Sequence, residues 1–400
     1  MKTRTVLLLL IGAAVLAGLY GCGQMQGSAG FSDMFRIKVE AVFKESVARN
    51  GFPGAVLGIM RASDGAELYL ATGMSEADDT TAMDQRTWMA KTAMTTDTRF
   101  RIASVSKTFT AILILKLIDE GKIALTDTID KYFPGLVPNS ASIEIKHLLT
   151  MSSGLYDHES SPYIEDYQFK GSLTQYFSPE ALIGYSNSYG GGTVKFAPGA
   201  NYEYCNTNFT ILAMIAEKVT GKTYDQLITE EILTPLGLTS TVAPSAADVN
   251  MPAPFAHGYQ PPDSASAWRD YSVQNMSWDL GAGSIVSTAP DLIRMIRAVY
   301  NGELISAAMK TAMMTPPPIT DMTGKPSLYG FGVACSADGT VGHTGANPGY
   351  NAVMIYSKGY YYAILGSAGM LSKIMTPTGE VTAVTSVSNI LKDVSAAVQE

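Results

Sequence analysis

The order of apolar and polar positions predicts helices and strands along most of the chain. From Phe31 apolar residues recur at helical spacing as far as Asn50-Gly51, a pair typical of a helix end. A β-hairpin follows, because two apolar runs, GAVLGIM and ELYLATG, flank the turn RASDG. Residues 108–120, TFTAILILKLIDE, are apolar nearly all round, which predicts a buried helix that closes at Gly121.

The middle of the chain, 122–275, shows helices and long loops but few convincing strands. Its segment 156–197 is rich in Tyr, Ser and Gly and poorly periodic, so we expect a functional or mobile loop there. The last third returns to β-rich runs, YGFGVACS, NAVMIYS and YYYAILGSA, and a helix is expected from about Pro377.

Strands at both ends with helices between them indicate one sheet built from both termini and a helical insertion. We expect an α/β domain made of residues 31–115 and 276–400, and a mainly helical domain over 116–275. No internal repeat is evident.

The N-terminus has the order of features found in an export signal. Lys2 and Arg4 are basic, and the apolar stretch that follows, residues 6–19, is short for a membrane span. We therefore expect a signal peptide over 1–21. The alternative is that this apolar stretch forms a buried first helix of the folded protein.

The end of this signal, Leu19-Tyr20-Gly21-Cys22, resembles a bacterial lipobox. That resemblance implies cleavage before Cys22, lipidation of its thiol, a tether over 22–30, and a lipoprotein anchored to a membrane of the cell envelope, facing the periplasm. Tyr20 is bulkier than the small residue usual there, so plain secretion stays open.

Composition adds few constraints. The 400 residues are 46% hydrophobic and 16% charged, which is typical of a globular protein with one large domain or two. The net charge of −8 argues against nucleic acid as the main partner. Cys205 and Cys335 are expected to be free buried thiols, although a disulfide stays open.

Ser104 and Lys107 are the first candidates for chemistry. They lie where the segment TRFRIAS meets the buried helix, and residues three apart share a helix face. A cation within hydrogen-bond reach helps a serine at a helix N-terminus to lose its proton. The alternative is a helix-capping serine beside a surface lysine.

The segments FRIASVSKTFTA and LLTMSSGL resemble the serine β-lactamase and penicillin-binding-protein superfamily, in particular its branch related to class C β-lactamases and D-alanyl-D-alanine carboxypeptidases. Further ordered matches extend from Gly51 to Ala363 and include PGANYEYCNTNF, LTPLGL and GAGSIVSTAPDL. The resemblance implies an antiparallel sheet flanked by helices with an all-helical insertion. It also implies a Tyr-x-Asn and a Lys- or His-Thr-Gly facing the serine.

Two segments compete for the Tyr-x-Asn. Tyr204-Cys205-Asn206 follows Pro-Gly and precedes a run with helical spacing, the context in which the family places this motif. Tyr185-Ser186-Asn187 has the more usual central serine but leads into three glycines, so we read 184–192 as a loop at the rim of the site. The third element is His343-Thr344-Gly345. The alternative interpretation of His343 is a partly buried histidine with a structural role only.

By resemblance the activity is acyl transfer to water, without a cofactor. Ser104 is the nucleophile, activated by Lys107 and by Tyr204, whose pKa is expected to be lowered by nearby cations. The implied oxyanion hole consists of the backbone N–H groups of Ser104 and Ala346. The implied substrate-binding residues are Asn206, His343, Thr344 and Gly345.

The substrate class stays open among a D-Ala-D-Ala peptide, an ester and a β-lactam. The histidine in place of the lysine typical of β-lactamases favours a carboxypeptidase-like hydrolase or an esterase. A non-catalytic penicillin-binding protein is the alternative from another class. An α/β-hydrolase is disfavoured because no G-x-S-x-G occurs, and a metal site because the four histidines lack ligand spacing.

Overall fold

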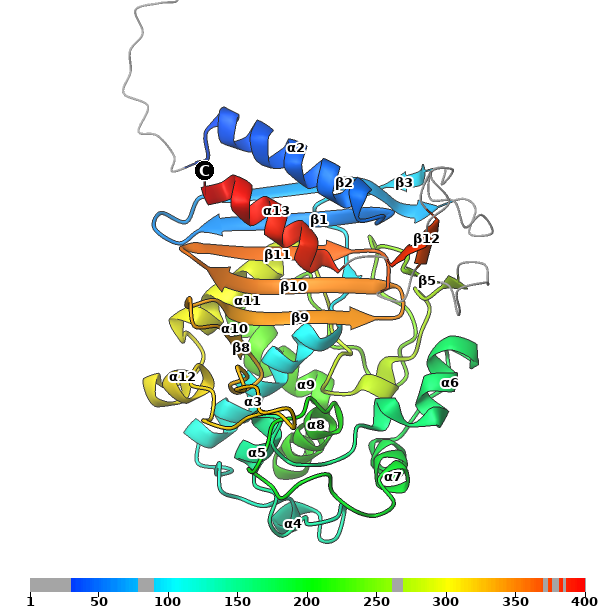
Figure 1. The fold of residues 1–400 in the computed structure, drawn as a ribbon, viewed down its shortest axis with the longest axis vertical. Coiled ribbons are helices and arrows are strands. Elements are labelled where there is room, and N and C mark those ends of the chain that lie inside the picture. The colour runs from blue at the N-terminus through cyan, green and yellow to red at the C-terminus, as the bar shows by residue number, and fades with distance from the viewer. Residues whose placement is uncertain are drawn as a thin grey trace, which may run out of the picture.

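The computed structural model describes residues 30–77, 90–260, 269–369, 373–375, 381–383 and 386–399. Its largest sheet is antiparallel, with strand order β3-β2-β1-β11-β10-β9-β8 (Figure 1). The N-terminal hairpin pairs directly with the C-terminal strands through β1 and β11, which confirms the expected sheet. Its strands are β1 (Gly54–Arg61), β2 (Glu67–Ala77), β3 (Ala90–Ala93), β8 (Ala334–Cys335), β9 (Val341–Asn347), β10 (Tyr350–Ser357) and β11 (Tyr360–Gly366).

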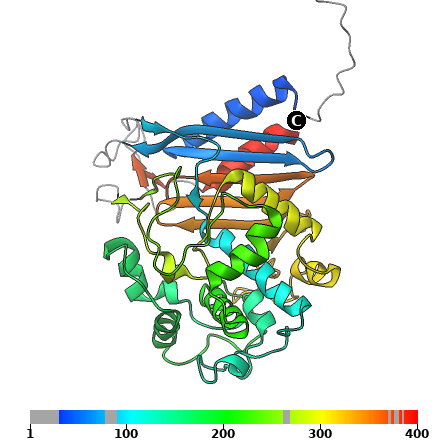
Figure 2. The ribbon, with the colours of Figure 1, turned by 180° about the vertical axis from the view of Figure 1, so that it is seen from behind.

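Helices cover both faces of this sheet. One face carries α2 (Asp33–Arg49) and α13 (Val387–Gln399), which pack side by side (Figure 1). The opposite face carries α11 (Ala289–Asn301), seen from behind in Figure 2. Because both faces are buried, neighbouring residues of β10 such as Val353 and Met354 enter different cores. This explains the nearly continuous apolar runs of the central strands.

The remaining elements are mostly helical, and most of these helices lie below the sheet in Figure 1, whereas β5 and β12 lie beside one end of it. The helices are α3 (Ser106–Asp119), α4 (Ile129–Tyr132), α5 (Ile145–Leu149), α6 (Pro162–Lys170), α7 (Pro179–Tyr189), α8 (Thr207–Thr220), α9 (Tyr224–Ile228), α10 (Thr234–Leu236) and α12 (Ala307–Met313). Short helical turns are η2 (Ala103–Val105), η3 (His158–Ser160), η4 (Thr229–Leu233) and η5 (Met276–Asp279). Two-stranded ladders pair β4 (Phe100–Arg101) with β7 (Val286–Ser287), β5 (Tyr259–Gln260) with β6 (Arg269–Asp270), and β12 (Lys373–Met375) with β13 (Val381–Ala383).

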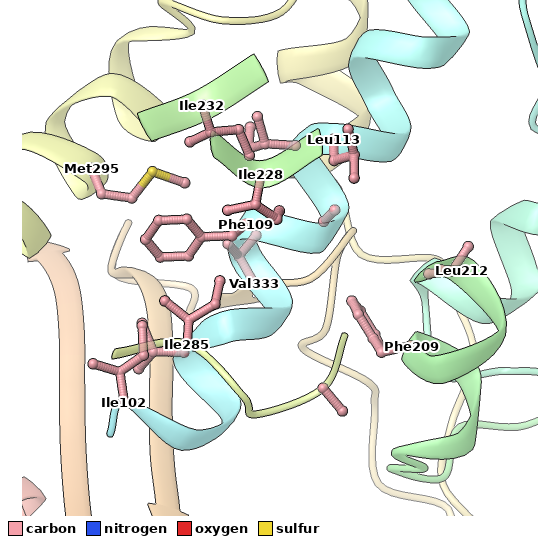
Figure 3. Close-up of a cluster of buried hydrophobic side chains, with 14 of the residues drawn as sticks. Ile102, Phe109, Leu113, Phe209, Leu212, Ile228, Ile232, Ile285, Met295 and Val333 are labelled. Carbon is pink, nitrogen blue, oxygen red and sulfur yellow. The ribbon is translucent and has the colours of Figure 1, made fainter. Parts of the chain in front are cut away.

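Helix α3 lies at the centre of the larger core, as its apolar sequence predicts. Figure 3 shows Phe109 and Leu113 of α3 packed near Ile228, while Met295 approaches from α11. Phe209 of α8 belongs to the same cluster. With apolar neighbours on every side, α3 is a rigid base for the serine and lysine at its N-terminus.

The expected loop over 156–197 is wrong, because most of this segment folds into η3, α6 and α7. Ser178 caps α7 and a proline starts it, so the helix continues to Tyr189. The predicted rim loop 184–192 is therefore largely helix. Within it, Ser186 Oγ donates to Tyr156 O at 2.6 Å.

The two ends of the chain differ in how far the structure describes them. The last helix begins at Val387, later than the expected Pro377, and residues 376–380 lie outside the described ones. The signal peptide, Cys22 and the tether up to Ala29 also lie outside the described residues. Among the described residues, no helix is long and apolar enough to cross a bilayer. The domain boundaries stay predictions.

Candidate active site

Ser104 lies on the η2 turn between β4 and the N-terminus of α3. The preceding Ala103 adopts φ of 49°, in the left-handed region that costs a non-glycine residue about 1–2 kcal/mol. The turn is held by Ile102 N, which donates to Ile285 O at 3.0 Å. This sharp turn presents a partly exposed Ser104 side chain at the end of a buried helix.

Lys107 is completely buried, one turn after the serine. Its Nζ donates to Ser104 Oγ at 3.0 Å and to the carbonyl of Ala282 at 2.9 Å. Burial lowers the pKa of Lys107, but the neighbouring Tyr204 and two carboxyl groups outweigh it, so the pKa lies above its ordinary value. Lys107 is thus a charged donor to the serine.

Tyr204 lies just before α8 and faces the same lysine. Lys107 Nζ is 5.0 Å from the centroid of the Tyr204 ring, and Lys107 and Ser104 are both near enough to the phenol to affect its pKa. Burial raises the pKa of Tyr204, and Lys107 opposes this only in part, so the pKa is raised. The expectation of a lowered pKa was wrong because it counted the cation and omitted desolvation.

Asn206 occupies the N-cap position of α8 and is 8% exposed. Its Nδ2 donates to Asp157 Oδ2 at 2.9 Å, and its backbone N–H donates to the same oxygen at 3.2 Å. Asp157 therefore fixes the orientation of the amide. The intervening Cys205 is buried in the core and free, as is Cys335, so Cys205 acts as a small apolar residue.

The structure brings Tyr204 to Ser104 and Lys107, and not Tyr185. The Tyr185 ring stacks on Tyr163 with centroids 4.7 Å apart, in a separate aromatic cluster between α6 and α7. The sequence context of the two tyrosines therefore selected the one that lies near Ser104. The helix that contains Tyr185 was not predicted.

His343 lies on β9 and is buried and uncharged. Its Nδ1 lies 2.5 Å from the Thr344 carbonyl and must donate there, so Nε2 accepts from the Tyr329 hydroxyl at 2.8 Å. Burial lowers the pKa of His343 to about 3, and Lys107 lowers it further. The ring cannot serve as a cation near neutral pH.

Gly345 brings the backbone of β9 against the nucleophile turn. A Cβ on Gly345 would lie 2.3 Å from Ile102 O and 3.0 Å from Ser104 N. Only glycine permits this approach. The next residue, Ala346, pairs with Asn351 of β10, so the two expected oxyanion-hole donors belong to adjoining backbone segments.

A pocket of about 380 Å³ opens beside Tyr204 and His343. Aromatic side chains dominate this end of it, and none of the described residues that line it is Lys or Arg. Thr344 is exposed and contributes to its wall. Among the described residues, no group of three or more His, Cys, Asp or Glu is arranged to hold a metal ion.

Sequence reasoning missed four side chains around this site: Asp157, Glu159, Asp279 and Tyr329. Asp279 and Tyr329 are the first residues of the glycine-containing segments DLGAG and YGFG. Asp157 and Glu159 fell in the segment read as a loop. An acidic residue next to an apolar Gly-rich turn was the available signal.

Comparisons with known proteins agree with this geometry. The Beta-lactamase family model matches residues 39–373. A penicillin-binding protein of Bacillus subtilis (strain 168) is 27% identical over 80% of this chain and 68% of its own length. A D-aminopeptidase of Brucella ovis is 28% identical over 65% of this chain, which spans only 48% of that relative.

Among solved structures, a D-stereospecific amidohydrolase from Streptomyces sp. superposes with a TM-score of 0.73 at 26% identity. The match covers 89% of this chain and 97% of that one. The sheet, the serine–lysine turn and the extent of the family match lead to one conclusion: this chain belongs to the Beta-lactamase family, within the superfamily of serine β-lactamases and penicillin-binding proteins.

Proposed function

We propose that this protein hydrolyses amide bonds of small D-configured substrates through an acyl-enzyme at Ser104. The observation that carries the proposal is the hydrogen bond from Lys107 Nζ to Ser104 Oγ at 3.0 Å, with the centroid of the Tyr204 ring 5.0 Å from the same Nζ. Ser104 Oγ attacks the substrate carbonyl in the fraction of the enzyme whose Tyr204 is ionised. The proton of Ser104 passes to that phenolate, and the phenol then returns the proton to the leaving amine. Water attacks the acyl-enzyme by the same route in reverse.

The pocket beside Tyr204 supports an uncharged leaving group. A carboxypeptidase must hold the terminal carboxylate of its substrate, and burying an unpaired carboxylate is costly. His343 is neutral and no described lining residue is Lys or Arg, so the pocket offers no cation of its own. The similarity to a D-stereospecific amidohydrolase and a D-aminopeptidase supports the same choice. We therefore rank D-amino acid amides above the D-Ala-D-Ala peptides expected from sequence.

A hydrolysis panel with purified protein tests the substrate class. It compares a D-amino acid amide, its L-enantiomer, a D-Ala-D-Ala peptide, a short-chain p-nitrophenyl ester and nitrocefin. We expect the highest kcat/KM among the amides for the D-enantiomer, and no turnover by Ser104→Ala. Faster release of D-alanine from the D-Ala-D-Ala peptide would restore the carboxypeptidase assignment. Turnover that survives Ser104→Ala would remove Ser104 as nucleophile.

We also propose that the protein is exported and anchored by a lipid on Cys22, on the basis of the basic, apolar and cysteine-terminated order of residues 1–22. The wild-type protein should fractionate with membranes in the expressing bacterium. Cys22→Ser should release it into the soluble fraction, whereas unchanged fractionation of this variant would contradict the anchor.

A further inference from the structure

Two carboxyl groups, Glu159 of η3 and Asp279 of η5, lie close to Lys107 and have no part in the steps above. Their side chains lie within hydrogen-bond reach of each other, so that each affects the pKa of the other. Asp279 is 2% exposed, and its buried Oδ1 meets no donor among the described residues when both groups are taken as carboxylates. Because carboxylate oxygens only accept, the contact requires a proton on one of the two groups.

The turn that follows Asp279 connects this pair to the lysine. The Asp279 carbonyl accepts from Ala282 N at 3.1 Å and from Gly283 N at 2.8 Å, while Ala282 O accepts from Lys107 Nζ at 2.9 Å. A Cβ on Gly283 would lie 1.7 Å from Asp279 Oδ2, so the turn wraps tightly around the carboxyl group. Asn347 Nδ2 donates to the carbonyl of Gly283 in the same turn at 3.3 Å.

Charged and titratable groups face the pair from several elements. His158 is buried, binds the Trp278 carbonyl through Nε2 at 2.9 Å, and has a pKa lowered by burial, so it is neutral. Asp157 is engaged by Asn206. Of the described groups that face the pair, Lys107 is therefore the one that carries a positive charge. These groups are Lys107, Asp157, His158, Tyr204, Tyr224 and Asn347.

We propose that Glu159 and Asp279 share one proton and act as a single negative charge that keeps Lys107 protonated. The inference rests on the proposed function, because it makes both carboxyl groups positioning residues for the activation of Ser104. With Lys107 held as a cation, the proton of Ser104 has to pass to Tyr204. Burial raises the pKa of Asp279 to about 6 and that of Glu159 well above its usual range, in line with a shared proton near neutral pH.

The test uses the variants Glu159→Gln, Asp279→Asn and the double variant. An amide stands in for the protonated carboxyl group, so each single variant retains one negative charge. The readout is the acid limb of kcat/KM, the pH range in which the rate rises as the base loses its proton. We expect each single variant to leave the acid limb where the wild type has it. The double variant loses the charge, which lowers the pKa of Lys107 and Tyr204 and moves the limb about 1–3 pH units lower.

Shifts in each single variant that add in the double variant would indicate two separate charges and overturn the proposal. Infrared spectroscopy at pH 7 gives a second readout that needs neither activity nor a folded double variant. The carbonyl band of a protonated carboxyl group should be present in the wild type and lost in each single variant; its persistence in both would also overturn the proposal. An inactive wild type with this band would contradict the proposed function and leave the shared proton standing.

Discussion

At the scale of single residues, burial governs the site more than sequence context suggests. Tyr204 and His343 both lie near Lys107, yet desolvation is the largest cause of the pKa shift of each. It raises the pKa of the phenol and lowers that of the imidazole, and in both residues the neutral form gains. At neutral pH most of the free enzyme therefore holds a neutral phenol and a neutral imidazole beside a charged lysine, and the Tyr204 phenolate that accepts the Ser104 proton is the minority form.

Replacing the two competing tyrosines tests which one is the base. Tyr204→Phe should lower the rate of Ser104 acylation about 100-fold or more, because the proton acceptor is lost. Tyr185→Phe is the matched control, since that ring packs between α6 and α7. Labelling kinetics with a fluorophosphonate probe measures both. Equal losses in the two variants would refute the assignment of Tyr204.

His343 should also affect stability at acid pH. Its pKa of about 3 in the folded protein lies below the unfolded value of about 6.5, so the unfolded state binds the proton first. Its contribution is fully present above pH 6.5 and is lost as pH falls towards 3. Between pH 7.5 and pH 5, the wild type should lose about 2 kcal/mol more than His343→Gln. Urea unfolding at both pH values measures this; an equal loss would contradict a buried neutral histidine.

At the scale of elements, the site depends on the contact between strand β9 and the turn before α3. Gly345 allows the strand backbone to approach Ser104 N, and the strained Ala103 turns the chain towards it. The rigid elements on each side, α3 and the seven-stranded sheet, hold this contact. Precision in the proposed oxyanion hole would therefore come from packing between elements.

Gly345→Ala should separate these elements. The added methyl group would press on Ile102 O and Ser104 N, so we expect acylation to fall about 100-fold, as on loss of one oxyanion-hole donor. Gly184→Ala is the matched control: that glycine is exposed on α7 with nothing within 4 Å of the added group. It should retain wild-type acylation and gain up to about 1 kcal/mol of stability. Wild-type acylation by Gly345→Ala would contradict the close contact.

At the scale of the whole molecule, the sheet separates two cores with different tasks. The core under α2 and α13 joins the ends of the described chain and lies across the sheet from α11, whereas the larger core surrounds α3 (Figure 3). Changes inside the core under α2 and α13, away from the pocket-lining Val353, Ile355 and Leu391, should therefore affect stability more than catalysis.

Ile390→Ala, on α13, should show this separation. Ile390 is fully buried, so truncation should lower the free energy of unfolding by about 3 kcal/mol. The kcat/KM of the folded variant at low temperature should match the wild type. The exposed Lys392→Ala is the control and should change neither quantity. A large loss of kcat/KM in folded Ile390→Ala would show that α13 supports the site.

Much of this architecture could be predicted from the amino-acid sequence. The first helix and the helix after Asn206 have apolar residues at helical spacing and clear end signals, the hairpin has a clear turn, and α3 is a long apolar run closed by Gly121. Such local patterns persist in the fold. The i, i+3 spacing likewise places Lys107 beside Ser104, because helix geometry alone sets that distance.

The structural features that local sequence patterns did not predict depend on segments that come into contact only in the folded protein. Helix α7 lies in a segment rich in Tyr, Ser and Gly that resembled a loop, and it is held by contacts such as that of Ser186 with Tyr156. The Glu159–Asp279 contact and the raised pKa of Tyr204 arise from burial by several elements at once. Desolvation is a property of the packed interior, and no single stretch of sequence encodes it.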